Sequence, residues 1–381
     1  MAAAENYVAY VGTYTNGKSK GIHIYDVDVA EGLLHLRKVV KCNNSSYLTV
    51  SRNGKYLYSI ADEGVIVFEI GPTGDLTAIN QIDIGGMRGN HLSTDLSGKY
   101  LFVGGYHDGR VTVVHTHQDG RLGSVMDGIF HRGQGAINER SFRPHVTCVR
   151  VTPDNHFLCA VDEALDQIIL YKIDHRTNTL KEVDVVRMGK QVGPKSIHFS
   201  KDGFFAYVLC QITNEIRVYQ YYIDQRGLPT FRQIQEVSTL SNAKDPYDAA
   251  SAMRLSYDGK YVVCATAGDD SVAMYKIDPE TGMLDRQFAL PTSGEYPKDI
   301  ALFPDQQHIA VCNNQGGTIT TFKIDYDKNV LMMKGKPQQI DTPNCMLFHK
   351  IEQAPESFRN ITEKEAEAEV QKRVRSYVPV N

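Results

Sequence analysis

The sequence lacks any long run of positive charge and any long run of apolar residues. Its 381 residues include 41 Lys and Arg against 45 Asp and Glu, which gives a formal net charge of −4. Without a basic stretch there is no electrostatic footprint for nucleic acid. No stretch approaches the ~18 apolar residues that a membrane-spanning helix needs. We therefore expect neither nucleic acid nor a membrane as a partner.

A secretory signal and paired cysteines are also missing. The first residues, MAAAENYVAYVG, do not place a basic head before a long apolar stretch, so no secretory signal is expected. The seven cysteines form no CxxC pair, and most lie in apolar runs: Cys42, Cys148, Cys159, Cys210, Cys264, Cys312 and Cys345. Such cysteines are typical of buried core residues in a reducing compartment. The sequence predicts a soluble cytoplasmic protein without disulfides or zinc ligands.

What the sequence does contain is an internal repeat of about fifty residues. Each unit has an apolar strand, a tight turn that often contains Asx-Gly, and a second apolar strand. Asx-Gly between apolar runs is a strong hairpin signal. The turns with their second strands read SRNGKYLYSIAD (51–62), DLSGKYLFVGGY (95–106), TPDNHFLCAVDE (152–163), SKDGFFAYVLCQ (200–211), SYDGKYVVCATA (256–267) and FPDQQHIAVCNN (303–314). A third strand and a fourth strand follow in each unit.

Four short antiparallel strands per unit, repeated without helices, are the signature of a β-propeller blade. Six units are complete, and a seventh assembles from both ends of the chain. Residues 342–350 supply its innermost strand, and 7–15, 21–28 and 33–40 supply the other three. The sequence therefore predicts an all-β, seven-bladed propeller over residues 5–351, closed by the N- and C-terminal strands. Two separate domains are the alternative, but no linker-like segment interrupts the repeat.

Residues 352–381 depart from the strand pattern. Pro355 interrupts it, and Thr362 with Glu365 forms a capping box before EKEAEAEVQKRVRSY, which favours a helix. A helix that lies on the propeller or joins two subunits into a homo-oligomer is one interpretation. A solvated tail is the other.

One mouth of the propeller's central channel collects polar residues. The first two strands of a blade are antiparallel, so the start of the first and the end of the second lie at the same end of the channel. The residues at these places are Ser46, Tyr47, Asp62, Glu63, Asn90, His91, Tyr106, His107, Arg143, His145, Thr147, Asp162, Glu163, Lys195, Gln211, Asp248, Arg254, Thr266, Asp269, Lys298, Asn313, Gln315, Thr13, Tyr14 and Asn344. This mixture suits a small anionic ligand rich in oxygen. At the opposite mouth we expect only structural turns.

Three stretches resemble a known family: HLSTDLSGKYLFVGGYHDGRV (91–111), GPKSIHFSKDGFFAYV (193–208) and SAMRLSYDGKYVV (251–263). They are similar to the propeller lactonases, which include bacterial 6-phosphogluconolactonases and fungal carboxymuconate cyclases. The resemblance implies a site at the polar mouth, built from a His, two Arg and a Glu. Matched in order, these positions hold Thr147, Lys195, Ala267 and Gln211 in this chain, and Lys298 replaces a further Arg.

This replacement moves the expected acid and base to other residues of the mouth. Gln211 cannot accept a proton, and Thr147 is a poor base. Residues two apart on a strand point to the same side, so His145 is predicted to face the channel with Thr147. A histidine titrates near neutral pH, which suits a general acid or base. The alternative for His145 is a histidine that only caps the start of a strand.

The predicted site has two parts. The catalytic residues are His145, Asp162, Glu163 and Lys195. The substrate-binding residues are His91, Tyr106, His107, Arg143, Thr147, Gln211, Arg254, Lys298 and Asn313. No cofactor is expected; the alternative is a divalent metal held by two or three imidazoles and a carboxylate.

Three functions are compatible with this mouth. The first is hydrolysis of a small anionic sugar-acid or aromatic-acid lactone. The second is an isomerase, cyclase or lyase that uses the same pocket for proton transfer. The third is a propeller that binds a small ligand without catalysis.

Overall fold

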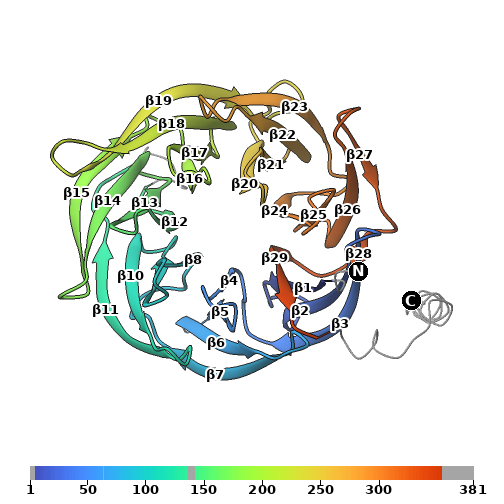
Figure 1. Ribbon diagram of the computed structural model, residues 1–381, viewed down its shortest axis with the longest axis horizontal. Helices are drawn as coiled ribbons and strands as arrows, with labels where there is room; N and C mark the ends of the chain where they lie inside the picture. The colour runs from blue at the N-terminus through green and yellow to red at the C-terminus, as the bar shows by residue number, and fades with distance from the viewer. Residues whose placement is uncertain (1–4, 63, 136–141, 354–381) are drawn as a thin grey trace.

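The computed structural model describes residues 5–62, 64–135 and 142–353. Their strands form seven antiparallel sheets arranged in a ring (Figure 1). Six sheets have four strands, and in the sixth blade the outer strand is split in two. No helix occurs within these described ranges. The predicted all-β, seven-bladed propeller is confirmed.

In blades 1 to 3 the chain runs from the innermost to the outermost strand. Blade 1 contains β4 (Leu48–Val50), β5 (Tyr56–Ala61), β6 (Gly64–Ile70) and β7 (Leu76–Ile82). Blade 2 contains β8 (His91–Thr94), β9 (Tyr100–Gly104), β10 (Arg110–Thr116) and β11 (Leu122–Phe130). Blade 3 contains β12 (Val146–Val151), β13 (Phe157–Asp162), β14 (Gln167–Asp174) and β15 (Thr179–Arg187).

Blades 4 to 6 continue in the same order. Blade 4 contains β16 (Pro194–Phe199), β17 (Phe205–Cys210), β18 (Glu215–Ile223) and β19 (Pro229–Ser238). Blade 5 contains β20 (Ala249–Leu255), β21 (Tyr261–Ala267), β22 (Ser271–Ile277) and β23 (Leu284–Pro291). Blade 6 contains β24 (Pro297–Leu302), β25 (His308–Asn313), β26 (Thr318–Asp325), β27 (Val330–Met333) and β28 (Gln338–Gln339).

Blade 7 joins the two ends of the chain. Its innermost strand is β29 (Pro343–Ile351), followed outward by β1 (Asn6–Thr13), β2 (Gly21–Asp28) and β3 (Leu33–Lys41). β29 pairs antiparallel with β1 from Asn6↔Ile351 to Thr13↔Pro343. This closure matches the sequence prediction, and it leaves β1 without a free inner edge. The predicted C-terminal extension lies almost wholly outside the described residues, which end at 353.

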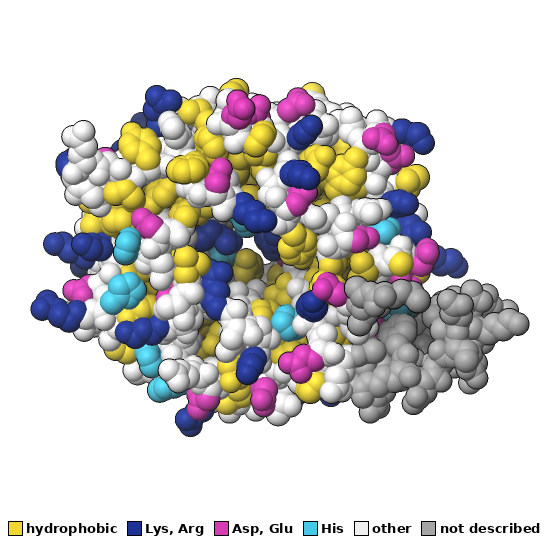
Figure 2. All heavy atoms as spheres, viewed as in Figure 1, with side chains coloured by type: hydrophobic (Ala, Val, Ile, Leu, Met, Phe, Trp, Pro, Cys, Tyr) yellow, Lys and Arg dark blue, Asp and Glu magenta, His cyan; other side chains and the backbone are white. Residues whose placement is uncertain are grey.

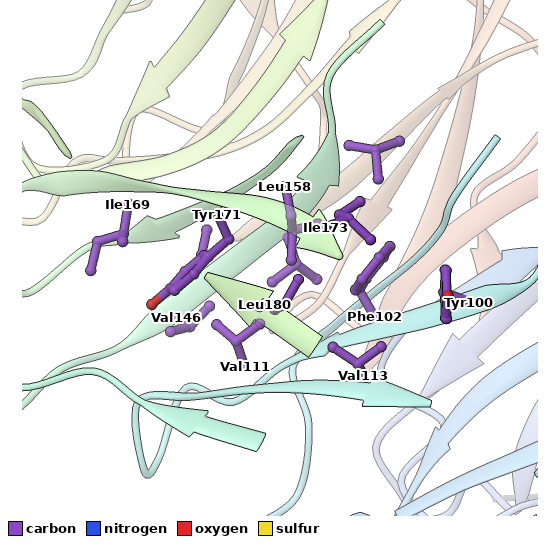
Figure 3. Close-up of a cluster of buried hydrophobic side chains, with 13 residues drawn as sticks. Tyr100, Phe102, Val111, Val113, Val146, Leu158, Ile169, Tyr171, Ile173 and Leu180 are labelled. Carbon is purple, nitrogen blue, oxygen red and sulfur yellow. The ribbon is translucent and has the colours of Figure 1, made fainter. Parts of the chain in front are cut away.

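The core lies between the blades. Seven clusters of buried hydrophobic side chains occur in the described structure, one between each pair of neighbouring blades. Figure 3 shows the cluster in which Tyr100 and Phe102 of blade 2 meet Leu158 and Tyr171 of blade 3. All seven cysteines are free and buried, as predicted. In the part of the chain that is described, no helix is long and apolar enough to cross a membrane.

In blades 1 to 6, the turn between the first and second strands lies at the same end of the ring. In blade 5, Ser256 donates to the carboxylate of Asp258 at 2.7 Å and accepts from the amide of Tyr261 at 2.9 Å. Gly259 then takes a φ of 77°, which a side chain disfavours. We call this end of the channel the lower mouth and the end where the innermost strands begin the upper mouth.

Candidate active site

All seven blades contribute to the lining of a cavity near the upper mouth, and one position recurs in each of them. The cavity has a volume of about 80 Å³. The seven residues, which we call the bulge ring, are Tyr47, Asn90, Thr147, Lys195, Ser251, Lys298 and Asn344. Five of them are the extra residue where the innermost strand shifts register against its neighbour: Thr147, Lys195, Ser251, Lys298 and Asn344. A β-bulge re-aims a side chain, and here it turns each one into the cavity.

Two lysines of the bulge ring provide positive charge that no ion pair neutralises among the described residues. Arg254, which also lines the cavity, makes an ion pair with Asp299 at 2.7 Å. Lys195 and Lys298 make no such pair within the described structure. The pKa of Lys298 is lowered by burial, although Glu163 and Asp299 act in the opposite direction. The cavity therefore attracts an anion or a polarised carbonyl oxygen.

Lys195 is held by a chain of hydrogen bonds. Its Nζ donates to Oε1 of Gln211, and Nε2 of Gln211 donates to Oε1 of Glu163 at 2.9 Å. Burial first, and then the nearby Lys298, lower the pKa of Lys195 to about 8, although Glu163 opposes the shift. An amine that titrates near pH 8 can accept and return a proton close to neutral pH. The sequence prediction had placed Lys195 and Glu163 among the catalytic residues, and the structure brings them together through Gln211.

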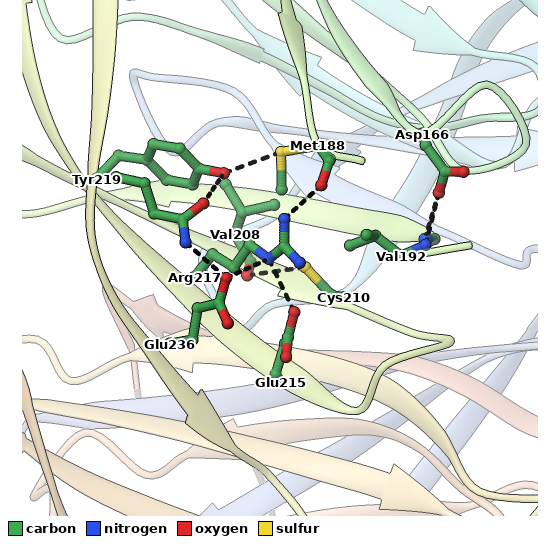
Figure 4. A network of polar contacts seen from close by, with 11 residues as sticks. Asp166, Met188, Val192, Val208, Cys210, Glu215, Arg217, Tyr219 and Glu236 are labelled. Atoms are coloured by element: carbon green, nitrogen blue, oxygen red, sulfur yellow. Dashed lines mark hydrogen bonds and ion pairs between the residues drawn. The ribbon is translucent and has the colours of Figure 1, made fainter. Parts of the chain in front are cut away.

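The backbone before Lys195 is fixed by one carboxylate. Asp166, in the turn between the second and third strands of blade 3, accepts from the amides of Gln191, Val192 and Gly193 at 2.7 to 2.8 Å. Figure 4 shows the contact with Val192 and, beside it, Arg217 donating to the carbonyl of Met188. These contacts hold the connection between blades 3 and 4 in place. They position the start of the strand that carries Lys195.

The prediction that His145 faces the cavity together with Thr147 was wrong. Thr147 is a bulge residue, so the regular alternation that placed His145 on the same side as Thr147 does not hold. Thr147 lines the cavity and His145 does not. The His145 ring stacks on Tyr106 with 4.2 Å between ring centroids. Burial lowers the pKa of His145, and His107 and Arg143 add to this while Asp162 opposes it.

The carboxylate of Asp162 does not hydrogen-bond to the imidazole ring of His145, because other groups occupy its oxygens. Its Oδ2 lies 2.7 Å from Nδ1 of His131, and both side chains are fully buried. Its Oδ1 accepts from the backbone amides of His145 and Leu165. Sequence reasoning missed His131, which directly follows the outermost strand of blade 2 and begins the connection to blade 3. Asp162 thus anchors this connection beneath the upper mouth.

Among the described residues, the imidazoles considered as metal ligands do not gather with a carboxylate into one group. His91 lines the cavity, but its Nδ1 accepts from the amide of Val149 at 3.3 Å and its Nε2 lies 3.6 Å from Sγ of Cys148. Burial first, and then two arginines, hold the pKa of His91 well below its ordinary value. His107 and Arg143 are exposed on the rim. No group of three or more His, Cys, Asp or Glu within the described ranges could hold a metal ion.

Asn313 is also misplaced in the sequence prediction. Its side chain is fully buried, donates to Thr318 and Thr320, and lies directly beneath Gly294. A ligand in the cavity cannot reach it there. Ser251 and Ser196, which line the cavity, were not predicted. The spacing from each turn could have identified Ser251, because Ser251 precedes Gly259 by the same eight residues that separate Lys195 from Gly203.

The expectation for the lower mouth was wrong as well. A second and larger cavity of about 670 Å³ lies there. Tyr47 and His198 line both cavities, so these two side chains stand between them. The lower mouth therefore holds more than turns.

The fold and the bulge ring together define a seven-bladed propeller with a lysine-bearing cavity at one mouth. The family described as Lactonase, 7-bladed beta-propeller matches residues 8–348, and the chain belongs to this family. The 6-phosphogluconolactonase of Bacillus subtilis is 29% identical over 351 residues, which cover 90% of this chain and 98% of that protein. The 6-phosphogluconolactonase of Formosa agariphila is 27% identical over 336 residues, which cover 84% and 94%. The structure of the periplasmic gluconolactonase of Pseudomonas aeruginosa is 26% identical, with a TM-score of 0.84 and coverage of 90% and 99%.

Proposed function

We propose that the protein hydrolyses a small anionic lactone, of a sugar acid or an aromatic acid, in the cavity of the bulge ring. The observation that supports this most directly is that Lys195, whose pKa is lowered to about 8, and Lys298 line the same cavity. Relatives named as gluconolactonases and 6-phosphogluconolactonases support the reaction class. The cavity of about 80 Å³ has room for an ester group and an attacking water.

In the proposed reaction, neutral Lys195 takes a proton from water as the water oxygen bonds to the lactone carbonyl carbon. The Lys298 ammonium stabilises the negative charge that develops on the carbonyl oxygen. The ring C–O bond then breaks, and the Lys195 ammonium returns its proton to the departing alkoxide. The product is the open hydroxy acid, and Lys195 is neutral again. Gln211 and Glu163 keep the amine in position throughout.

The test is hydrolysis in water labelled with ¹⁸O, using gluconolactone, 6-phosphogluconolactone and muconolactone. The spontaneous rate is subtracted from each measurement. Hydrolysis puts one labelled oxygen into the product carboxylate. A rate no greater for the wild-type protein than for Lys195→Met would contradict the proposal, as would turnover without label, which indicates isomerisation or elimination. Lys190→Met is the matched control, because Lys190 is an exposed lysine in the same connection between blades.

A further inference from the structure

All charged residues that line the cavity at the lower mouth are positively charged. Its lining residues come mainly from blades 1 to 4: Tyr47, Thr49, Val50, Ser51, Arg52, Leu92, Ser93, Thr94, Leu96, Arg150, Val151, Thr152, Pro153, His198, Phe199, Ser200, Lys201 and Leu255. This set contains two arginines, one lysine and no Asp or Glu. Figure 2 shows Lys and Arg side chains bordering the central hollow of the molecule.

The three cations have no acidic partner in the described structure. Neither Arg150 nor Lys201 makes an ion pair there. Arg52 donates only to the backbone carbonyl of Asp95. The pKa of Arg52 is lowered by partial burial and by the neighbouring Arg150, although Asp95 opposes this shift. Two guanidinium groups that repel each other across a cavity are a favourable arrangement for a bound dianion.

Polar atoms of the wall also lack partners. The buried Nε of Arg150 and the Oγ of Ser93, a residue that is 8% exposed, make no hydrogen bond in the described structure. Buried polar groups normally have a partner, so such atoms mark a place where a ligand or water completes the bonding. Thr94 lines the same cavity, whereas the hydroxyls of Ser51 and Thr152 in its wall already bond within their turns.

We propose that the lower mouth is a second ligand site, separate from the bulge ring, which binds a small phosphomonoester. The planar guanidinium forks of Arg52 and Arg150 match phosphate oxygens in pairs. The hydroxyls of Ser93 and Thr94 suit the sugar or polyol portion of such a ligand. A volume of about 670 Å³ is in the range of small-molecule sites. His198 stays a neutral hydrogen-bonding group in the wall, because burial and then Arg150 and Arg254 hold its pKa well below the ordinary value.

The experiment measures binding of inorganic phosphate, glucose 6-phosphate and gluconate by titration calorimetry at low ionic strength. We expect the two phosphates to bind, and gluconate to bind at least tenfold more weakly. Arg150→Gln, and separately the double variant Arg52→Gln with Lys201→Gln, should each weaken phosphate binding at least tenfold. Both residues of the double variant are exposed, so it tests the site even if Arg150→Gln does not fold.

Lys260→Gln is the control, because Lys260 is an exposed lysine on a turn of the same face and does not line the cavity. It should bind phosphate as the wild type does. The proposal is overturned if phosphate does not bind, if gluconate binds as tightly as glucose 6-phosphate, or if the lower-mouth variants bind phosphate unchanged. It is also overturned if Lys298→Gln, at the other cavity, is the variant that abolishes binding.

Discussion

Nζ of Lys195 donates to the amide oxygen of Gln211, a neutral partner, while the carboxylate of Glu163 lies one residue further along the same hydrogen-bond chain. The amine is therefore positioned without a direct ion pair. A carboxylate in contact with it would favour the charged form and raise its pKa. With glutamine in that place, burial and Lys298 keep the pKa of Lys195 lowered to about 8.

The first prediction concerns the pH dependence of lactone hydrolysis. Lys195 must be neutral to take a proton from water, so kcat/KM should rise with pH and level off with a midpoint near 8. Lys298→Met removes a charge that lowers this pKa, so its midpoint should move to higher pH. Rates are measured from pH 6 to 10 after subtraction of the spontaneous reaction. A profile that is flat over this range would contradict the assignment of Lys195.

Replacing Gln211 by glutamate provides an independent test of the hydrogen-bond chain from Lys195 through Gln211 to Glu163. The new carboxylate would contact Lys195 directly and stabilise its ammonium form. We expect Gln211→Glu to move the midpoint of the pH profile upward by about one unit or more. Glu163→Gln removes a carboxylate that raises the pKa of Lys195, so its midpoint should move downward. Shifts in the same direction for both variants would exclude the proposed chain.

Removal of the amine itself should reduce turnover more than binding. We expect Lys195→Met to lower kcat by ~10²-fold or more, the scale of one acid–base group. Lys195→Arg should not rescue it, since a guanidinium stays protonated in this pH range. Lys298→Met should raise KM as well as lower kcat. Steady-state kinetics of the three variants, with Lys190→Met as control, separate these effects.

The role of His145 can be decided by one substitution. Because its ring stacks on Tyr106 and does not line the cavity, we expect His145→Ala to reduce kcat by far less than ~10²-fold. A loss of that size would restore His145 as the acid or base that the sequence predicted. Thermal unfolding of the variant shows whether any smaller effect comes from weakened packing.

The buried contact between His131 and Asp162 predicts a change in stability. His131→Ala leaves the fully buried carboxylate of Asp162 without its imidazole partner. We expect the free energy of unfolding to fall by about 3 kcal/mol. His156→Ala, at a 70%-exposed histidine 3.7 Å from Asp154, should change it by less than about 0.5 kcal/mol. Urea denaturation measures both changes. Equal decreases in the free energy of unfolding would show that the buried contact stabilises the fold no more than the exposed one.

The blades could be predicted from the sequence because their signals are local and repeated. Asx-Gly turns, alternating apolar residues and a constant period specify each four-stranded sheet without knowledge of distant contacts. The closure by β29 and β1 followed from counting strands. No comparable sequence signal predicted that the outer strand of blade 6 is split into β27 and β28.

The site was predicted less well, for two physical reasons. A bulge at Thr147 shifts the alternation on which the placement of His145 depended, and bulges have no fixed residue signature. The partner of Asp162 is His131, which a different connection brings to it. At the lower mouth, Arg52 and Lys201 both follow the first residue of a turn, a position that was interpreted only as part of the turn.

The seventh blade has a consequence for how the protein is made in the cell. Strands β1 to β3 leave the ribosome first, but their inner neighbour β29 begins at Pro343. At ~5–20 residues per second, roughly 20–70 s pass before that strand emerges. For this time the edge of β1 is unpaired and open to other chains. The ring can close only after β29 has emerged, so we expect nascent chains stalled before residue 343 to depend on chaperones for their solubility.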